Sequence, residues 1–281
     1  MMTTIMETLR SDKVRGNIGH LLHLPAGRES SVLAEQENFR LKLAESPAEV
    51  EAALRLRYRV FKEEQGRLAN CCGGIDRDRF DRYCRHLLVI DKATENVVGT
   101  YRVLGGAASA GNFYSEEEFS IRGLQVIRHE VCEVGRSCVA PEFRSGAVVG
   151  LLCSGLAALR RRPKPSRSLL VRYARRRRPG SSCAFHYLFG CVSLEETDQA
   201  AAMALYEYFR RNGLLSDRLQ AKPRAGFELD PVSAEEVERR LEETGGGIIR
   251  TLPPLFKGYV KLGAKICGAP AYDREFGTID F

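Results

Sequence analysis

A glutamate and an arginine interrupt an apolar run between residues 131 and 139. Glu133 and Arg136 lie among Val131, Cys132, Val134, Cys138 and Val139, a pattern typical of a buried strand. An ionised carboxylate in such a strand is costly unless it is paired or serves a chemical step. We therefore interpret Glu133 as a functional carboxylate.

An anion-binding turn is predicted directly after this run. The loop Pro141–Ala147 contains Arg144 and Gly146 and leads into an apolar helix expected over Val148–Leu159. A strand, a short glycine-containing loop and a helix in this order direct free backbone N–H groups at an anion. A functional carboxylate beside an anion site indicates an enzyme.

Further charges occur at positions that are otherwise apolar or close together. Asp76, Asp78 and Asp81 form an acidic cluster, which is typical of a solvated turn but would also suit an ammonium group. Arg57 lies in a predicted helix and Arg102 in a predicted strand. Arginines at such positions are either solvated or turned inward toward a carboxylate or phosphate.

The elements that position these residues follow from periodicity and capping signals. Ser46, Pro47 and Glu49 form a capping box with proline at the first helical position. His86–Ile90 and Val97–Leu104 read as a hairpin. The remaining predicted elements are a strand over 39–44, a short helix over 113–119, a strand over 184–194, helices over 198–211, 235–243 and 252–270, and a last strand within 273–281.

The composition favours one domain. The 281 residues, 44% of them apolar, fill one large core or two small ones, and no linker divides the pattern. We expect a loose arm over 1–37 and a single domain over 38–281. The sequence has no apolar run of the roughly 18 residues that a membrane span needs and no signal-peptide core. Nine irregularly spaced cysteines without a paired CxxC predict reduced thiols, no metal site and a cytoplasmic protein.

The basic charge is concentrated in one segment. Ten of the 43 Lys and Arg residues lie in 160–178, which has no acidic residue, so the rest of the chain is slightly acidic. We read 160–182 as a basic insertion that is either mobile or contacts an anionic membrane, an acidic carrier protein or nucleic acid. A basic nucleic-acid-binding protein is the alternative to an enzyme, but no nucleic-acid-binding motif accompanies the charge.

Five motifs stand out along the chain: Arg57–Phe61, Asp76–Asp81, Val98–Arg102, Glu133–Arg136 and Leu252–Ala264. Together they resemble the ornithine lipid N-acyltransferases, a hemolysin-like group within the GNAT fold. The likeness runs from about Phe39 to the C-terminus, and its first four motifs are shared with the acyl-homoserine-lactone synthases. The fifth motif, with Leu188–Cys191, favours the ornithine enzymes.

The resemblance implies an α/β (α+β) fold with a mixed, mostly antiparallel central sheet and helices on both faces. It implies transfer of a fatty, 3-hydroxy acyl group from the phosphopantetheine of acyl carrier protein to the α-amine of ornithine, without a bound cofactor or metal. Arg144–Val149 matches the coenzyme A pyrophosphate loop poorly, which favours acyl carrier protein over acyl-CoA as donor. The alternatives are a lactone synthase that accepts S-adenosylmethionine and a synthase for another N-acyl amino acid.

The resemblance also suggests roles for individual residues. Glu133 is the candidate general base, directly or through a water, and Arg136 pairs with it or with a nearby acid. An acyl-cysteine route through Cys132 or Cys138 is disfavoured, because no histidine pairs with either at a recognisable spacing. The expected contacts are Ser137 and Val139 with the oxyanion, Arg144 and Gly146 with the donor phosphate, Asp78 and Asp81 with the acceptor ammonium, and Arg57 and Arg102 with the acceptor carboxylate or the phosphate.

Overall fold

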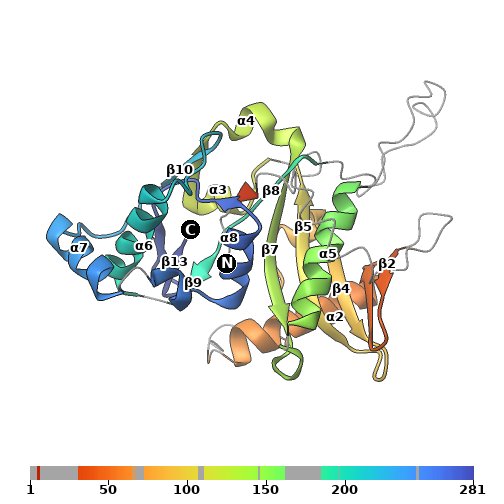
Figure 1. The fold of residues 1–281 in the computed structure, drawn as a ribbon. Coiled ribbons are helices and arrows are strands. Elements are labelled where there is room, and N and C mark those ends of the chain that lie inside the picture. Colours follow the sequence, from red (N-terminus) through yellow and green to blue (C-terminus); the bar gives the residue numbers. More distant parts are fainter. Residues whose placement is uncertain are drawn as a thin grey trace. The chain divides into compact units, whose positions relative to one another are not determined.

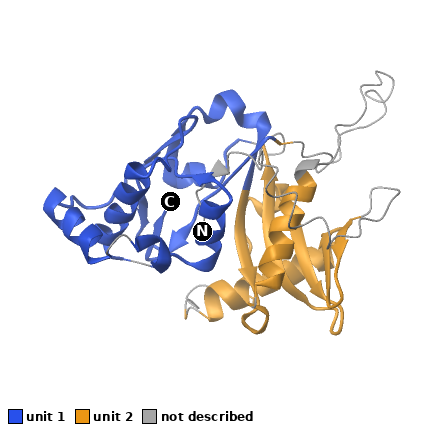
Figure 2. Ribbon diagram, in the orientation of Figure 1, with its two compact units in different colours: residues 1–10, 111–133, 186–281 blue, residues 11–110, 134–185 orange. Residues whose placement is uncertain are grey.

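The protein is represented by a computed structural model (Figure 1). It describes residues 31–64, 66, 73–106, 111–144, 146–161, 185–195, 197–244 and 247–281, and the backbone of Ile5–Met6. The chain forms two compact units (Figure 2). Unit 1 comprises residues 1–10, 111–133 and 186–281, and unit 2 comprises residues 11–110 and 134–185.

Unit 2 is built on a mostly antiparallel sheet, as predicted. Its strands run in the order β7-β5-β4-β3-β2, and β2/β3, β3/β4 and β4/β5 are antiparallel pairs. The strands are β2 (Val32–Glu35), β3 (Phe39–Leu43), β4 (Arg85–Asp91), β5 (Val97–Gly105) and β7 (Val131–Val139), whose last six residues belong to this unit.

Two helices cover opposite faces of this sheet, α2 (Pro47–Tyr58) and α5 (Ala147–Arg161). Leu88 and Ile90 of β4 pack with Ala53 of α2. Leu87, which points the other way, lies against Gly155 of α5, where an added Cβ would be 2.6 Å from Leu87 Cδ2. Both faces of β4 are therefore buried, which explains its unbroken apolar run.

The start of α2 follows its capping signal. Ser46 Oγ accepts a hydrogen bond from the Glu49 N–H, and the Glu49 carboxylate accepts one from the Ser46 N–H. The helix continues as a π-helical turn over Arg59–Glu63. Short 3-10 helices at Asp81–Tyr83 and Pro141–Phe143 complete unit 2. The capping box thus sets the start of the helix that carries Arg57.

Unit 1 is made of short strands and helices. The first three residues of β7 pair in parallel with β8 (Tyr187–Phe189). Its other strands are β1 (Ile5–Met6), β6 (Phe119–Arg122), β9 (Ser193–Leu194), β10 (Gln220–Pro223), β11 (Ala264–Lys265), β12 (Ala271–Asp273) and β13 (Thr278–Asp280). Its helices are α3 (Ser115–Glu118), α4 (Leu124–Ile127), α6 (Gln199–Arg211), α7 (Ala234–Glu243), α8 (Pro254–Lys261) and the 3-10 turns Arg128–Glu130 and Ile248–Thr251.

Three predicted elements differ from the structure. The strand expected over 184–194 is divided into β8 and β9, because the chain leaves the β7 ladder after Phe189. The helix expected over 252–270 ends at Lys261, and Gly263 follows with a left-handed φ of +88°. The predicted arm 1–37 contains β2, whose Leu33 and Ala34 are buried.

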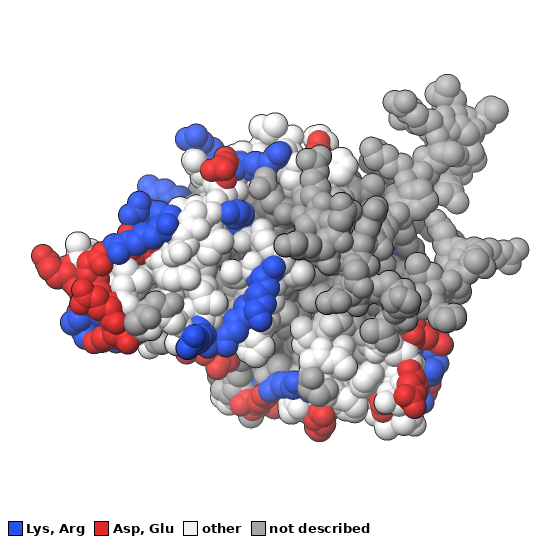
Figure 3. Space-filling model, in the orientation of Figure 1, with Lys and Arg blue, Asp and Glu red and all other residues white. Residues whose placement is uncertain are grey.

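The charged surface around α7 carries both signs. Acidic and basic side chains lie next to one another at the end of unit 1 that carries α7 (Figure 3). Arg239 pairs with Glu236 and Glu243, and Arg211 pairs with Glu238. Such interspersed pairs give no field of a single sign. The basic insertion beyond Arg161 lies outside the described residues, so its predicted contacts stay predictions. Among the described helices, none combines the length and apolar character needed to cross a membrane.

Candidate functional site

The Glu133 carboxylate is buried and held at the start of α3 in unit 1. From the described residues of α3 and its N-terminal neighbour, its side chain receives three hydrogen bonds: Oε2 accepts from the Tyr114 N–H at 2.8 Å, and Oε1 accepts from both the N–H and the hydroxyl of Ser115 at 2.7 Å. These donors compensate for the removal of the carboxylate from water. Glu133 is only 6% exposed, and these hydrogen bonds fix the direction of its carboxylate.

Ser115 connects Glu133 to a cysteine. Its fully buried hydroxyl donates to Glu133 and accepts a weak hydrogen bond from Cys191 Sγ at 3.2 Å. Sequence reasoning missed both residues. A serine in the first turn of an acidic helix is a common capping signal, whereas only the fold brings Cys191 to it.

The centre of unit 2 is a buried network of arginines and aspartates. Arg57, which is fully buried, donates from Nε to Asp76 Oδ2 at 2.8 Å and from Nη1 to Asp81 Oδ1 at 2.7 Å. Two of its guanidinium donors thus serve different carboxylates. Among Arg55, Arg57 and Arg59 of the same helical region, Arg57 is the one turned inward. Asp76, which the sequence analysis left without a role, is part of this network.

Two further arginines complete the network. Arg102 Nη1 donates to Asp78 Oδ2 at 2.5 Å and lies 3.4 Å from Asp81 Oδ1. Arg136 lies 3.5 Å from Asp78 and 3.7 Å from Asp76, so it contacts nearby acids, one of the two pairings suggested for it. Its φ of +50° is rare for a residue with a side chain and distorts β7 next to Ser137.

The charges of the network shift one another's titration. Burial alone raises the pKa of Asp81, but the guanidinium groups of Arg57 and Arg102 outweigh it and lower that pKa to about 2. Burial lowers the pKa of His86 to about 4, and its ring nitrogens have no hydrogen-bond partner among the described residues. At neutral pH, three arginines thus face three aspartates and an uncharged histidine. Asp78 and Asp81 are bound to arginines in this structure.

The strand–turn–helix unit predicted after β7 is present. Arg144 Nη1 and Nη2 bind the Glu64 carboxylate at 2.6 and 2.7 Å, and Arg144 Nε donates to the Val139 carbonyl oxygen at 3.1 Å. Gly146, with a φ of +94°, precedes the first turn of α5. Since Arg144 is engaged by Glu64, the remaining anion donors here are the N–H groups of that first helical turn. Ser137 is half-buried and Val139 is buried.

The cysteines of β7 are poor nucleophiles. Cys132 and Cys138 are both buried. Burial raises the pKa of the Cys138 thiol to about 12, so the thiol stays protonated at neutral pH. A protonated, buried thiol is a poor candidate for an acyl-cysteine route.

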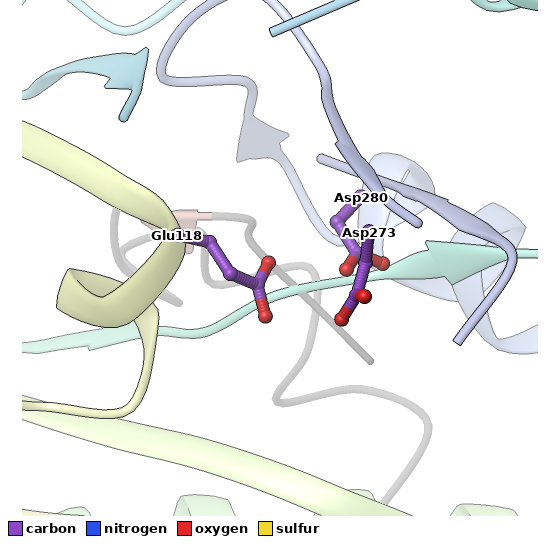
Figure 4. Close-up of side chains that lie close together, drawn as sticks. All are labelled: Glu118, Asp273 and Asp280. Carbon is purple, nitrogen blue, oxygen red and sulfur yellow. The ribbon is translucent and has the colours of Figure 1, made fainter. Parts of the chain in front are cut away.

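A second carboxylate cluster lies in unit 1. Glu118 of α3 points toward Asp273 of β12 and Asp280 of β13 (Figure 4). The three side chains are buried, and one carboxylate oxygen from each lies within 4.8 Å of the others. Their spacing in the sequence gives no sign of this cluster, which sequence reasoning missed.

Comparison with known proteins identifies the catalytic type. Residues 56–154 match the family model of an acetyltransferase (GNAT) domain. This range contains the Arg–Asp network and β7, together with the end of α2 and the first half of α5. Together with the curated relatives described next, this match shows that the chain is an acyltransferase.

Curated relatives match most of the chain. It is 32% identical over 266 residues to the L-ornithine N(alpha)-acyltransferase of Brucella abortus, covering 90% of this chain and 85% of the relative. It is 34% identical to the enzyme of the same name from Rhizobium meliloti, covering 91% and 82%. The solved structure of the AHL synthase LasI aligns with a TM-score of 0.33 and 16% identity over 45% of this chain and 66% of that chain, a likeness too weak to indicate function.

Proposed function

Because the chain belongs to the family of the L-ornithine N(alpha)-acyltransferases, we propose that it acylates the α-amine of ornithine with a fatty acyl group of the 3-hydroxy type. The donor is acyl carrier protein rather than acyl-CoA, and the product is lyso-ornithine lipid. The observation that carries the proposal is the match to these relatives over about nine-tenths of the chain. The GNAT domain within it agrees with acyl transfer to an amine.

The reaction joins an amine to a thioester. The amine nitrogen attacks the carbonyl carbon, the C–N bond forms, the C–S bond breaks, and the pantetheine sulfur leaves with the proton that the nitrogen gives up. Holding the two groups at attack distance supplies most of the acceleration. The proposal needs no metal and no resident cofactor, since the donor arrives on its carrier.

Glu133 is the proposed general base. Its three hydrogen bonds hold the carboxylate in one direction, which supports a role in orienting or deprotonating the amine, directly or through a water. In the route through a water, that water takes the proton from the amine and passes its own proton to Glu133.

The turn between β7 and α5 is the proposed site of the donor phosphate. A phosphopantetheine arm carries one phosphodiester, which the N–H groups at the start of α5 suit. Gly146 has no side chain to block that approach. No described atom lies within 4 Å of where a Cβ would be, so the space beside it is open. The distortion at Arg136 supports an oxyanion role for the N–H groups of Ser137–Val139.

The basic segment is the proposed contact with acidic surfaces. Residues 160–178 suit acyl carrier protein or an anionic membrane, and each Lys or Arg near such a membrane contributes about 1 kcal/mol. We therefore place the enzyme in the cytoplasm, peripheral to the inner face of the membrane. Nucleic acid is not a proposed partner.

Two measurements test this function. Mass spectrometry of lipids from cells that express the chain is expected to show N-acyl ornithine, with its amount strongly reduced by Glu133→Gln. Purified chain with acyl carrier protein thioester is then expected to acylate ornithine and to leave S-adenosylmethionine unreacted. Turnover of S-adenosylmethionine would contradict ornithine as the acceptor. Equal turnover of acyl-CoA and the carrier-bound donor would contradict acyl carrier protein as the preferred donor.

A further inference from the structure

The Glu118 carboxylate is buried in unit 1. Glu118 is 2% exposed, and neither of its oxygens has a hydrogen-bond partner in the described part of the chain. An unsatisfied buried carboxylate of this kind is strongly destabilising. In a native structure it therefore calls for an explanation, such as a missing ligand.

Asp273 and Asp280 present their carboxylates to the same place. In the β12/β13 hairpin Asp280 pairs with Ala271, and Asp273 lies two residues after Ala271, so both aspartates project from one face. Asp273 Oδ1 accepts hydrogen bonds from the N–H groups of Glu275 and Phe276, which fix the side chain. Glu118 approaches this face from α3 (Figure 4).

The contrast with unit 2 points to the kind of ligand. There, three aspartates are matched by three buried arginines, so little negative charge remains for a further cation. The Glu118 carboxylate has no such cation in the described residues. Three carboxylates around one point match the three N–H donors of a primary ammonium group.

Glu118 also lies one helical turn from the residue that holds Glu133. Ser115, which holds Glu133, and Glu118 are three residues apart on α3, a spacing that brings side chains onto one face about 5–6 Å apart. Ornithine carries its α-amine and its side-chain ammonium on carbons separated by two methylene groups. The spacing of its two nitrogens is thus comparable with the spacing of Ser115 and Glu118 on α3.

We propose that Glu118, Asp273 and Asp280 bind the side-chain ammonium of the acceptor and so select a diamino acid over an amino acid with an apolar side chain. This inference rests on the proposed function, which supplies ornithine as the acceptor. It assigns the ammonium to this cluster, whereas the sequence suggested Asp78 and Asp81 for that role.

Titration supports this assignment. Burial, followed by the neighbouring Asp280, raises the pKa of Glu118 to about 9, and burial also raises the pKa of Asp273. Without a cation, the cluster therefore keeps a proton at neutral pH. An incoming ammonium displaces that proton, so ornithine binding releases it to the buffer.

Calorimetry tests the binding site without catalysis. Titration of the full chain with L-ornithine at pH 7, in buffers of different ionisation enthalpy, is expected to show proton release. Norvaline, the same amino acid without the side-chain nitrogen, is expected to release none. Glu118→Gln is expected to bind ornithine without proton release and roughly 10- to 100-fold more weakly.

Kinetics test selectivity. The ratio of kcat/KM for ornithine over norvaline is expected to fall roughly 10- to 100-fold in Glu118→Gln and to stay at the wild-type value in Glu117→Gln, its neighbour on α3. Asp280→Asn provides a second variant if Glu118→Gln fails to fold. An unchanged ratio in folded variants would overturn the inference.

Two further outcomes separate the inference from its premise. If the wild-type chain acylates another amine and not ornithine, the proposed function fails first. If it acylates ornithine but holds one Mn²⁺ or Ca²⁺ per chain that Glu118→Gln loses, the cluster is a metal site and the inference is wrong.

Discussion

The hydroxyl and the N–H of Ser115 both donate to the same oxygen of Glu133, each at a distance of 2.7 Å. These two bonds tie the candidate base Glu133 to the first turn of α3, which lies eighteen residues earlier in the sequence. The orientation of the carboxylate and the start of the helix therefore depend on each other.

Ser115→Ala is expected to lower stability and activity together. It removes one donor to a buried charge, which corresponds to roughly 1.5–3 kcal/mol in the free energy of unfolding. Urea denaturation checks the stability, and kcat checks the activity. A variant with wild-type stability but reduced kcat would show that the hydroxyl acts on the reaction and not on the helix.

Arg57→Met is expected to destabilise the chain by about 3–5 kcal/mol, because it leaves buried aspartates without their cation. Arg55→Met, on the same helix, removes an exposed pair with Glu51 and is expected to change the free energy of unfolding by about 0–1 kcal/mol. Chemical denaturation of both variants measures the difference. Equal effects would mean that Arg57 is not the centre of the network.

Above pH 5, the ligand-free Glu118→Gln variant is expected to be more stable than the wild-type chain. The difference in the free energy of unfolding is expected to grow up to about pH 9. The pKa of Glu118 is raised from 4.5 to about 9 in the folded chain, so folding retains a proton that the unfolded chain loses. Wild-type stability from this group is complete below pH 4.5 and falls as pH rises toward 9. One proton gives a slope of at most about 1.4 kcal/mol per pH unit. Thermal unfolding of both proteins from pH 5 to 9 checks the divergence.

Gly268→Ala is expected to disrupt unit 1 locally. A Cβ at this position would lie 1.8 Å from the Ala221 carbonyl oxygen, next to the hydrogen bond from the Ala221 N–H to the Cys267 oxygen. Because the obstacle is backbone, the expected loss is at least about 1–3 kcal/mol. Gly258→Ala in α8 meets nothing within 4 Å and is expected to be neutral or stabilising by up to about 1 kcal/mol. Denaturation midpoints of the two variants provide the comparison.

Local signals explain which elements the sequence predicted. The capping box at Ser46–Glu49, the hairpin around Asp91–Asn96 and the turn after Val139 each depend on residues close together in the chain. Phe189 and Ser193 belong to different strands, β8 and β9, although the apolar run over 184–194 looks continuous in the sequence. The break arises because β8 pairs with β7 whereas β9 pairs with β13, and these pairings exist only in the folded chain.

The candidate site was predictable only in part for a similar reason. Glu133 and Arg57 stand out as charges in apolar patterns, but sequence alone does not give their partners. The three acids of the cluster in unit 1 come from α3 and from a hairpin more than 150 residues later. Their individual settings are unremarkable, so only tertiary structure reveals them as a group.

The neutrality of the Arg–Asp network limits how the chain can change. Arg57, Arg102 and Arg136 balance three aspartates, and the nearby His86 adds no charge at neutral pH. Losing any one member leaves an odd charge in the interior, whereas losing an oppositely charged pair keeps the balance. In related sequences, an arginine and an aspartate of this network should therefore be replaced together. A sequence in which only one of them is replaced should also differ at other residues that pack around the network.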